Sequence, residues 1–184
     1  DNKNELITAE ISKISDARIV WGGDNTVEMI KKFKLKPRAV DISFADRYSL
    51  CVINFINFLK LNTNMKESLV NNFYNDTFTL DQNACSSPHL ILWYGTNVKK
   101  VKKVFWSLLA NVIKKRYYLI ESSSVNKYML ICKKLMQNDN IKDLEIYNNS
   151  LYTLSLKKLQ NDVSNYRGQW GFFFQFQIKN LNYL

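Results

Sequence analysis

An apolar run of β-forming residues, Ala17-Arg18-Ile19-Val20-Trp21, is followed directly by Gly22-Gly23. The next pair, Asp24-Asn25, supplies side chains that can cap a helix, and apolar residues then recur at helical spacing. Pro37 ends this helix, and Ala39-Val40-Asp41-Ile42 has the composition of a second strand. The first forty residues therefore predict strand–Gly-Gly–helix–strand, a βαβ unit.

The rest of the chain continues the alternation of strands and helices. Residues 48–61 carry both strand and helix signals, and the apolar spacing from Phe55 to Leu59 favours a helix that starts near Ser49. A polar, Asn-rich stretch follows, and the buried strand Leu90–Tyr94 comes after it. Beyond it we expect a basic amphipathic helix over about 98–116, capped by Asn97, a helix over 122–137, short strands within 143–160 and a strand over 172–178. A further helix is expected over 5–14. This order indicates an α/β fold.

Composition narrows the class of protein. The 184 residues are 46% apolar, which is enough for a packed core, and no apolar run is long enough to span a bilayer. The first residues are polar and charged, which is not the pattern of a signal peptide. Three cysteines, an odd number, argue against a disulfide framework and favour the reducing cytoplasm.

The net charge of +10 raises the question of nucleic-acid binding. The lysines occur mainly as pairs spread along the chain, such as Lys31-Lys32 and Lys114-Lys115, and most lie beside apolar residues at helical spacing. This pattern is typical of solvated helix faces, so we regard nucleic-acid binding as the weaker interpretation.

Three features could carry chemistry. Cys85 lies among small and polar residues just before a strand, where a thiolate is accessible to a substrate carbonyl, whereas Cys51 and Cys132 lie in apolar runs that predict buried packing. The only histidine, His89, follows Cys85 by four residues and is either an acid or base or a hydrogen-bonded residue at a strand start. The Gly22-Gly23 turn opens a helix whose free N–H groups could bind an anion. One histidine with scattered cysteines predicts no metal site.

Two segments together resemble a known family. They are Ile19-Val20-Trp21-Gly22-Gly23-Asp24-Asn25-Thr26 and Gln82-Asn83-Ala84-Cys85-Ser86-Ser87-Pro88-His89-Leu90. They resemble the acyl-CoA reductase (LuxC-like) family of fatty-acid reductases, a branch of the aldehyde dehydrogenase superfamily. The Cys-Ser-Ser-Pro-His string is the most specific feature. The resemblance is good over residues 15–95 and continues weakly to Arg167-Gly168-Gln169 and the Phe-rich strand.

The resemblance implies an NADPH-dependent oxidoreductase. Cys85 would take an acyl group from a long-chain acyl-CoA or acyl-protein thioester, and hydride from NADPH would release a fatty aldehyde. Asn83 stands where aldehyde dehydrogenases carry the Gln of Gly-Gln-x-Cys, and His89 would be a candidate acid or base. The cofactor's pyrophosphate and nicotinamide end would be faced by Gly22, Gly23, Asp24 and Thr26. The catalytic candidates are Cys85, His89 and Asn83. An acyl-transferring partner protein and a homo-oligomer of the full-length protein are compatible with the resemblance.

The chain also departs from the family. The Glu-Leu-Gly-Gly segment of oxidising aldehyde dehydrogenases is replaced by residues 42–47, Ile-Ser-Phe-Ala-Asp-Arg, which carry no Glu to activate water and so suit a reductase, although Asp46 could substitute. Family members are about twice this length. We therefore expect residues 1–42 to be the last βαβ of an NADP-binding domain, 43–170 an aldehyde dehydrogenase-like catalytic domain fragment, and 171–184 a strand returning to the missing part. Such a fragment is expected to be inactive alone.

Two other functions stay open at this stage. An aldehyde dehydrogenase that works in the oxidising direction would prefer free aldehyde with NAD(P)⁺. A basic, non-enzymatic interaction module would bind nucleic acid in a salt-dependent way that does not involve Cys85.

Overall fold

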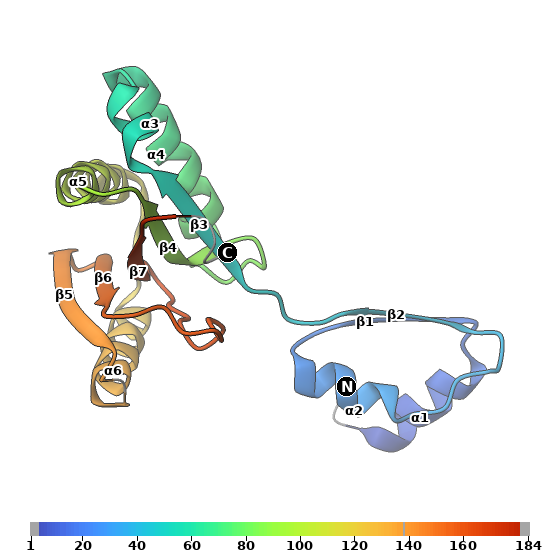
Figure 1. The fold of residues 1–184 in the computed structure, drawn as a ribbon. Helices are drawn as coiled ribbons and strands as arrows, with labels where there is room; N and C mark the ends of the chain where they lie inside the picture. Colours follow the sequence, from blue (N-terminus) through green and yellow to red (C-terminus); the bar gives the residue numbers. More distant parts are fainter. Residues whose placement is uncertain (1–3, 138, 181–184) are drawn as a thin grey trace. The chain divides into compact units, whose positions relative to one another are not determined.

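The computed structural model describes residues 4–137 and 139–180, and it divides the chain into two compact units, Asp1–Arg47 and Tyr48–Leu184 (Figure 1). The division lies five residues beyond the boundary expected at residue 42. Residues 1–3 and 181–184, which belong to the outer two predicted segments, lie outside the described residues.

The first unit is the predicted βαβ unit preceded by a helix. Helix α1 (Glu5–Ile14) leads into β1 (Ala17–Trp21), α2 (Asp24–Lys31) and β2 (Val40–Phe44), and β1 and β2 pair in parallel. The half-buried Arg18 on β1 holds the unit together. Its guanidinium donates to the Asp41 carboxylate at 2.6 Å and to the backbone carbonyls of Ile30 and Phe33 at 2.9 and 3.0 Å.

The second unit is built on a five-stranded sheet of order β3-β4-β7-β6-β5. Its strands are β3 (Ser49–Asn54), β4 (Pro88–Tyr94), β5 (Ile141–Asn148), β6 (Leu151–Leu156) and β7 (Phe172–Ile178). All neighbours are parallel except the β5–β6 pair at one edge. The predicted strand over 172–178 therefore lies in the centre of this sheet, between β4 and β6.

Four helices accompany this sheet: α3 (Phe55–Lys60), α4 (Thr63–Phe78), α5 (Lys99–Arg116) and α6 (Glu121–Gln137). Helices α3, α4 and α5 cover one face of the sheet and α6 covers the other (Figure 1). The helices α5 and α6 match the sequence prediction closely.

Three local predictions were wrong. Residues 49–54 form strand β3 rather than the start of a helix, because they pair with β4 and the helix begins only at Phe55. The Asn-rich stretch, to which the sequence analysis assigned no element, is mostly the sixteen-residue helix α4. Helix α5 is preceded by Val98 as its N-cap, without a side-chain cap hydrogen bond, rather than by Asn97, and α2 is capped by Gly23 rather than by Asp24 or Asn25.

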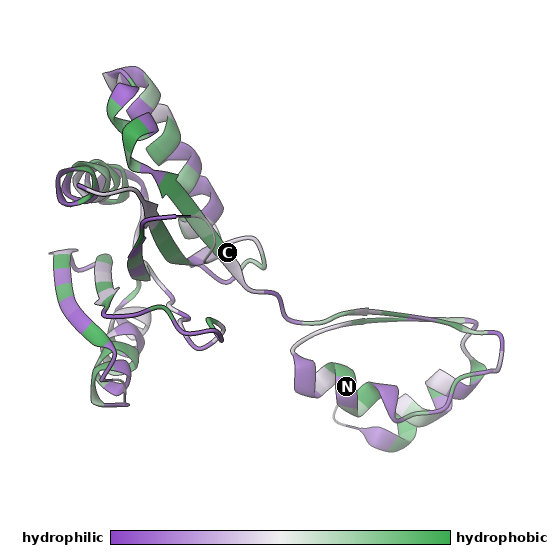
Figure 2. Cartoon of the chain, viewed as in Figure 1, coloured by the Kyte–Doolittle hydropathy of each residue, from purple (hydrophilic) through white to green (hydrophobic). Residues whose placement is uncertain are grey.

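Aromatic side chains dominate the core between the sheet and the α4–α5 layer. Phe105 and Trp106 of α5 pack edge-to-face on Trp93 of β4, and Phe73 of α4 packs on Phe105 at a ring separation of 5.2 Å. Figure 2 shows that β3 and β4 are strongly hydrophobic while the helices carry both polar and apolar stripes. No helix among the described residues is long and apolar enough to cross a membrane.

Candidate functional site

The Cys85 segment is the loop that joins α4 to β4, residues 79–87. The backbone at Asp81 and Gln82 has positive φ, 52° and 65°, in the left-handed region that costs a non-glycine residue about 1 kcal/mol or more. The loop therefore turns sharply before Cys85, and surrounding contacts must hold the turn.

The buried side chain of Gln82 provides those contacts. It is 1% exposed. Its Nε2 donates to the carbonyls of Pro88 and Phe172 at 3.2 and 3.1 Å, and its Oε1 accepts from the Gly171 N–H at 3.2 Å. One side chain thus joins the loop to the starts of both β4 and β7.

The backbone around Cys85 is fixed on two further sides. The Cys85 carbonyl accepts a hydrogen bond of 2.7 Å from the Ser49 hydroxyl at the start of β3. The buried Ser87 hydroxyl donates to the Asp76 carbonyl in α4 at 2.6 Å, and the Ser87 N–H closes a turn onto the Ala84 carbonyl. The Cys85 side chain itself is exposed. The loop therefore presents an accessible thiol on an immobilised backbone.

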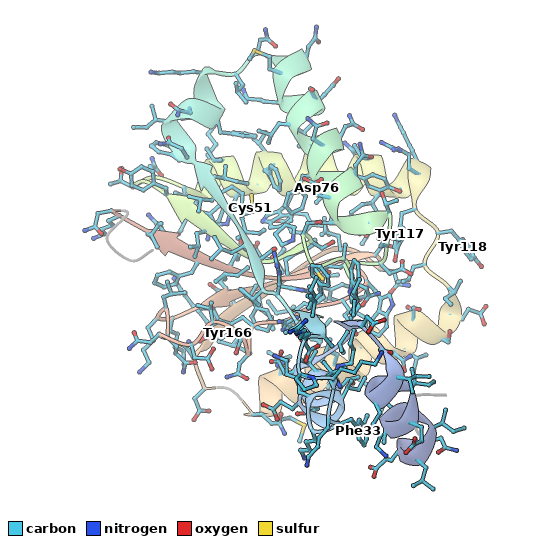
Figure 3. The ribbon with its side chains drawn as sticks, turned by 90° about the vertical axis from the view of Figure 1, so that its right-hand side faces the viewer. Phe33, Cys51, Asp76, Tyr117, Tyr118 and Tyr166 are labelled. Atoms are coloured by element: carbon cyan, nitrogen blue, oxygen red, sulfur yellow. The ribbon has the colours of Figure 1, made fainter. Side chains whose placement is uncertain are left out.

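Cys51 is in a different environment. It is half-buried on β3, beside Asp76 of α4, in a mainly apolar pocket of about 570 Å³ between β3, α3 and α4 (Figure 3). Burial, with a smaller contribution from the Asp76 carboxylate, raises the pKa of the Cys51 thiol to about 11. This thiol is protonated at neutral pH and is a poor nucleophile. Cys132 is also half-buried rather than fully buried.

His89 lies at the start of β4 and is 6% exposed. Its Nδ1 is 3.0 Å from the Gly168 carbonyl oxygen, and because a carbonyl can only accept, Nδ1 carries a proton and donates it to this hydrogen bond. The ring also packs against Tyr48 at 5.7 Å. The geometry is that of a hydrogen-bonded histidine at a strand start, and a role as acid or base stays a prediction.

The backbone position whose carbonyl binds His89 has room only for a glycine, Gly168. A Cβ at Gly168 would lie 1.7 Å from the Phe172 carbonyl oxygen, so no other residue fits there without moving the backbone. The 167–171 loop is further held by Lys127 of α6, whose buried ammonium donates to the carbonyls of Asn149 and Trp170. Burial lowers the pKa of Lys127 to about 8.

Asn83 is oriented by a residue that the sequence analysis did not assign to the site. The Gln169 amide donates to the Asn83 Oδ1 at 2.7 Å, which leaves the Asn83 amide nitrogen as a donor. The two residues are 86 positions apart, so only the fold brings them together. The weak continuation of the resemblance to Gln169 was the one signal that could have identified this contact.

The predicted cofactor turn belongs to the first unit, and its residues lie together at the start of α2. Gly23 caps the helix through its carbonyl, which accepts from Thr26 N–H at 2.9 Å and Val27 N–H at 3.0 Å. A Cβ at Gly22 would press on the Thr26 side chain at 3.2 Å, whereas a Cβ at Gly23 would meet open space. The turn therefore leaves room for a ligand beside Gly23, while the Asp24 carboxylate in the first turn opposes a phosphate at that point.

Among the described residues, no group of three or more His, Cys, Asp and Glu could hold a metal ion.

Comparisons with known proteins place these features in a family. The acyl-CoA reductase (LuxC) family matches residues 1–148, which include both the Cys85 loop and the Gly22-Gly23 turn. No curated protein is a significant match to the chain.

Solved structures show the same fold at low sequence identity. An NAD-dependent aldehyde dehydrogenase from Sinorhizobium meliloti aligns with a TM-score of 0.63 at 7% identity, over 96% of this chain and 37% of that one. An aldehyde dehydrogenase from Bartonella henselae gives 0.61 at 9% identity, over 98% and 40%, and Staphylococcus aureus AldH gives 0.60 at 13%, over 97% and 40%. The chain thus spans about two fifths of the length of the aldehyde dehydrogenases that it matches.

Proposed function

Because the chain belongs to the LuxC family of acyl-CoA reductases, we propose that it is the acyl-transfer part of an NADPH-dependent reductase that converts a long-chain acyl thioester to a fatty aldehyde. The observation that carries the proposal is the exposed Cys85 thiol on a loop whose backbone is held by β3, α4 and β7.

In the first step the Cys85 sulfur attacks the thioester carbonyl carbon. A new carbon–sulfur bond forms, the bond to the departing thiol breaks, and the proton of the Cys85 thiol ends on the leaving sulfur. One thioester replaces another, so acyl loading needs little driving force. A rigid loop favours this step because the reacting atoms must meet in one orientation.

The oxyanion that forms in this step needs hydrogen-bond donors. Among the described residues, none accepts a hydrogen bond from the backbone N–H of Cys85 or Ser86, and the Asn83 amide nitrogen is oriented by Gln169. These three donors are the candidates for stabilising the oxyanion, a contribution of about 3 kcal/mol for one good donor.

The His89 ring, which is hydrogen-bonded to the Gly168 carbonyl, is the candidate base for the thiol proton. Its buried position makes an indirect role, through the Gly168 carbonyl and the 167–171 loop, the competing interpretation.

NADPH, when bound, supplies the hydride that reduces the acyl-cysteine and frees the Cys85 sulfur. In the first unit the fit to a dinucleotide is partial: the open space beside Gly23 admits the backbone approach of a ligand, and the Asp24 carboxylate suits a ribose hydroxyl better than a phosphate. The Thr26 side chain lies beside Gly22, so a larger residue at position 22 would press on it. We expect the chain alone to take up an acyl group without releasing aldehyde, because it spans only part of the length of the dehydrogenases that it resembles.

The test is intact-mass spectrometry after incubation with a long-chain acyl-CoA. We expect a single acyl adduct that hydroxylamine removes, that is lost in Cys85→Ser and that is kept in the matched variant Cys132→Ser. An adduct that persists in Cys85→Ser, or no adduct on a folded chain, would contradict the proposal.

A further inference from the structure

A second concave site lies in the Tyr48–Leu184 unit, away from the Cys85 loop. It is a pocket of about 990 Å³ formed by β5, β6, β7 and the first turns of α5. Its β6 and β7 residues are at the carboxyl ends of these parallel strands, which is where open α/β sheets usually bind ligands. Cys85 precedes the amino end of β4, so roughly 20 Å of strand separates the two levels of the sheet.

The pocket concentrates positive charge. Its lining includes two carboxylates, Asp143 and Glu145, and six lysines: Lys99, Lys102, Lys103, Lys142, Lys157 and Lys179. None of the ion pairs formed within the described part of the chain involves any of these lysines. Glu145 is already engaged, because its carboxylate accepts hydrogen bonds from Tyr147, Thr153 and Gln175. The lysines of the lining therefore outnumber its two carboxylates, and none of these lysines forms a salt bridge within the described structure.

The start of α5 adds to this excess instead of relieving it. The N-terminal end of a helix favours acidic residues, yet α5 has none in its first turn and carries four lysines within its first five residues, 99–103. Its N-cap, Val98, offers no side-chain acceptor to the free N–H groups. Lysines gathered at the positive end of a helix destabilise it locally, and a bound anion would reverse that effect.

Lys102 shows the effect most clearly. Burial lowers the pKa of this half-buried lysine, and the nearby Lys142 lowers it further, while Glu145 and Asp143 act in the opposite direction. A partly desolvated ammonium group gains from an anion placed beside it, and an anion between Lys102 and Lys142 would also offset their mutual repulsion.

Hydrogen bonds within the chain hold one wall of the pocket in place without a ligand. The Gln177 side chain on β7 donates to the carbonyls of Gly95 and Thr96 at 2.8 and 2.9 Å, and the Gly95 N–H donates to the Ile178 carbonyl. The loop that leads into α5 is therefore tied to β7, and the first turn of α5 is held against the sheet.

We propose that this pocket binds a small anion with several phosphate charges, held mainly by Lys102, Lys142 and the first turn of α5. The lysines line a concavity, so they can contact one compact anion from several sides. The site is separate from the Cys85 chemistry and does not depend on the proposed reductase activity.

Calorimetric titration of the 184-residue chain with inorganic tripolyphosphate tests the proposal. We expect one ion to bind per chain, with an affinity that falls steeply between about 50 and about 200 mM salt. Lys102→Gln and Lys142→Gln should each weaken binding by about tenfold, as expected for loss of one charge-assisted hydrogen bond. The matched control is the double variant Lys114→Gln/Lys115→Gln at the other end of the same helix, which should bind within about twofold of the parent.

Lys142 lies on the edge strand β5, so its variant keeps the test valid if Lys102→Gln fails to fold. A control variant weakened as much as the pocket variants would mean that only the overall charge matters and would overturn the proposal, as would absence of saturable binding. A parallel titration uses adenosine 3′,5′-bisphosphate. Binding of both probes supports a phosphate site, whereas binding of the nucleotide alone would show recognition of the base and contradict it.

Discussion

Replacing Gln82 by Met should loosen the loop that carries Cys85. The side chain makes three buried hydrogen bonds, to Pro88, Phe172 and Gly171. Each such bond contributes about 0.5–1.5 kcal/mol net, and Met fills a similar volume, so we expect Gln82→Met to lower the free energy of unfolding by about 2–4 kcal/mol. The positive φ of residue 82 is present in both proteins and largely cancels.

Urea denaturation followed by tryptophan fluorescence measures this loss. The exposed Gln160 provides the matched control, since Gln160→Met should change stability by less than about 0.5 kcal/mol. We also expect slower acylation of Cys85 in Gln82→Met under conditions where the protein is folded. A loss below about 0.5 kcal/mol with an unchanged denaturant slope would refute the reasoning, because it would show that these bonds do not hold the loop.

The pH dependence of stability in a second variant, Gln82→Glu, tests the same contacts. At neutral pH the carboxylate would face the Pro88 and Phe172 carbonyl oxygens, so its pKa in the folded protein should be raised above the ordinary value of about 4.3. A raised carboxyl pKa means that stability falls as pH rises above the unfolded value. We therefore expect Gln82→Glu to be closer in stability to the parent at pH 4 than at pH 7.

Three other substitutions test how much individual buried polar side chains contribute to stability. Arg18→Met should destabilise the Asp1–Arg47 unit by about 1–3 kcal/mol. Hydrogen bonding to Arg18 lowers the pKa of Asp41, so the parent loses this stabilisation as the pH falls through the lowered pKa. The variant should therefore lose less stability in acid, as measured by circular dichroism. Gln175→Leu leaves two buried indole N–H groups without an acceptor and should lower the free energy of unfolding by about 2–4 kcal/mol, measured by urea denaturation. A decrease of less than about 1 kcal/mol would contradict this. Burial lowers the Lys127 pKa to about 8, so stability should rise between pH 8 and pH 9.5 in the parent but not in Lys127→Met, as measured by denaturation at each pH.

Local patterns were enough to predict much of the fold. The βαβ unit, the strand within β4, and helices α5 and α6 formed close to where the periodic apolar residues predicted them. The buried face of α6 differs from the expected one: Val125, Met129 and Leu135 are exposed, and Ser123, Lys127 and Ile131 are buried instead. Strand β3 was missed because it runs into α3 at Asn54 with no Gly or Pro between them, so two periodicities overlap. Helix α4 was missed because its asparagines hide the buried spacing of Val70, Phe73 and Phe78.

The contacts of the site could not be read in the same way. Gln82 reaches residues about 90 positions away on β7, and Gln169 reaches Asn83 across 86. Such pairs depend on the strand order β4-β7, and nothing in the local sequence specifies that Phe172–Ile178 inserts beside Pro88–Tyr94. The identity of Cys85 as the exposed cysteine could be predicted, but its supports could not.

The hydrogen bonds that hold the Cys85 loop are relevant to the function of Cys85. A cysteine that only packs gains nothing from a backbone turned through two left-handed residues and tied by Ser49, Ser87 and Gln82 to three different elements. Cys51 shows the packing case, since its thiol is half-buried and its pKa is raised to about 11. A nucleophile needs the opposite combination, an accessible sulfur on a backbone that does not move, because a misplacement of about 1 Å can cost two orders of magnitude in rate. The arrangement around Cys85 therefore supports the proposed role as a nucleophile over that of a structural thiol.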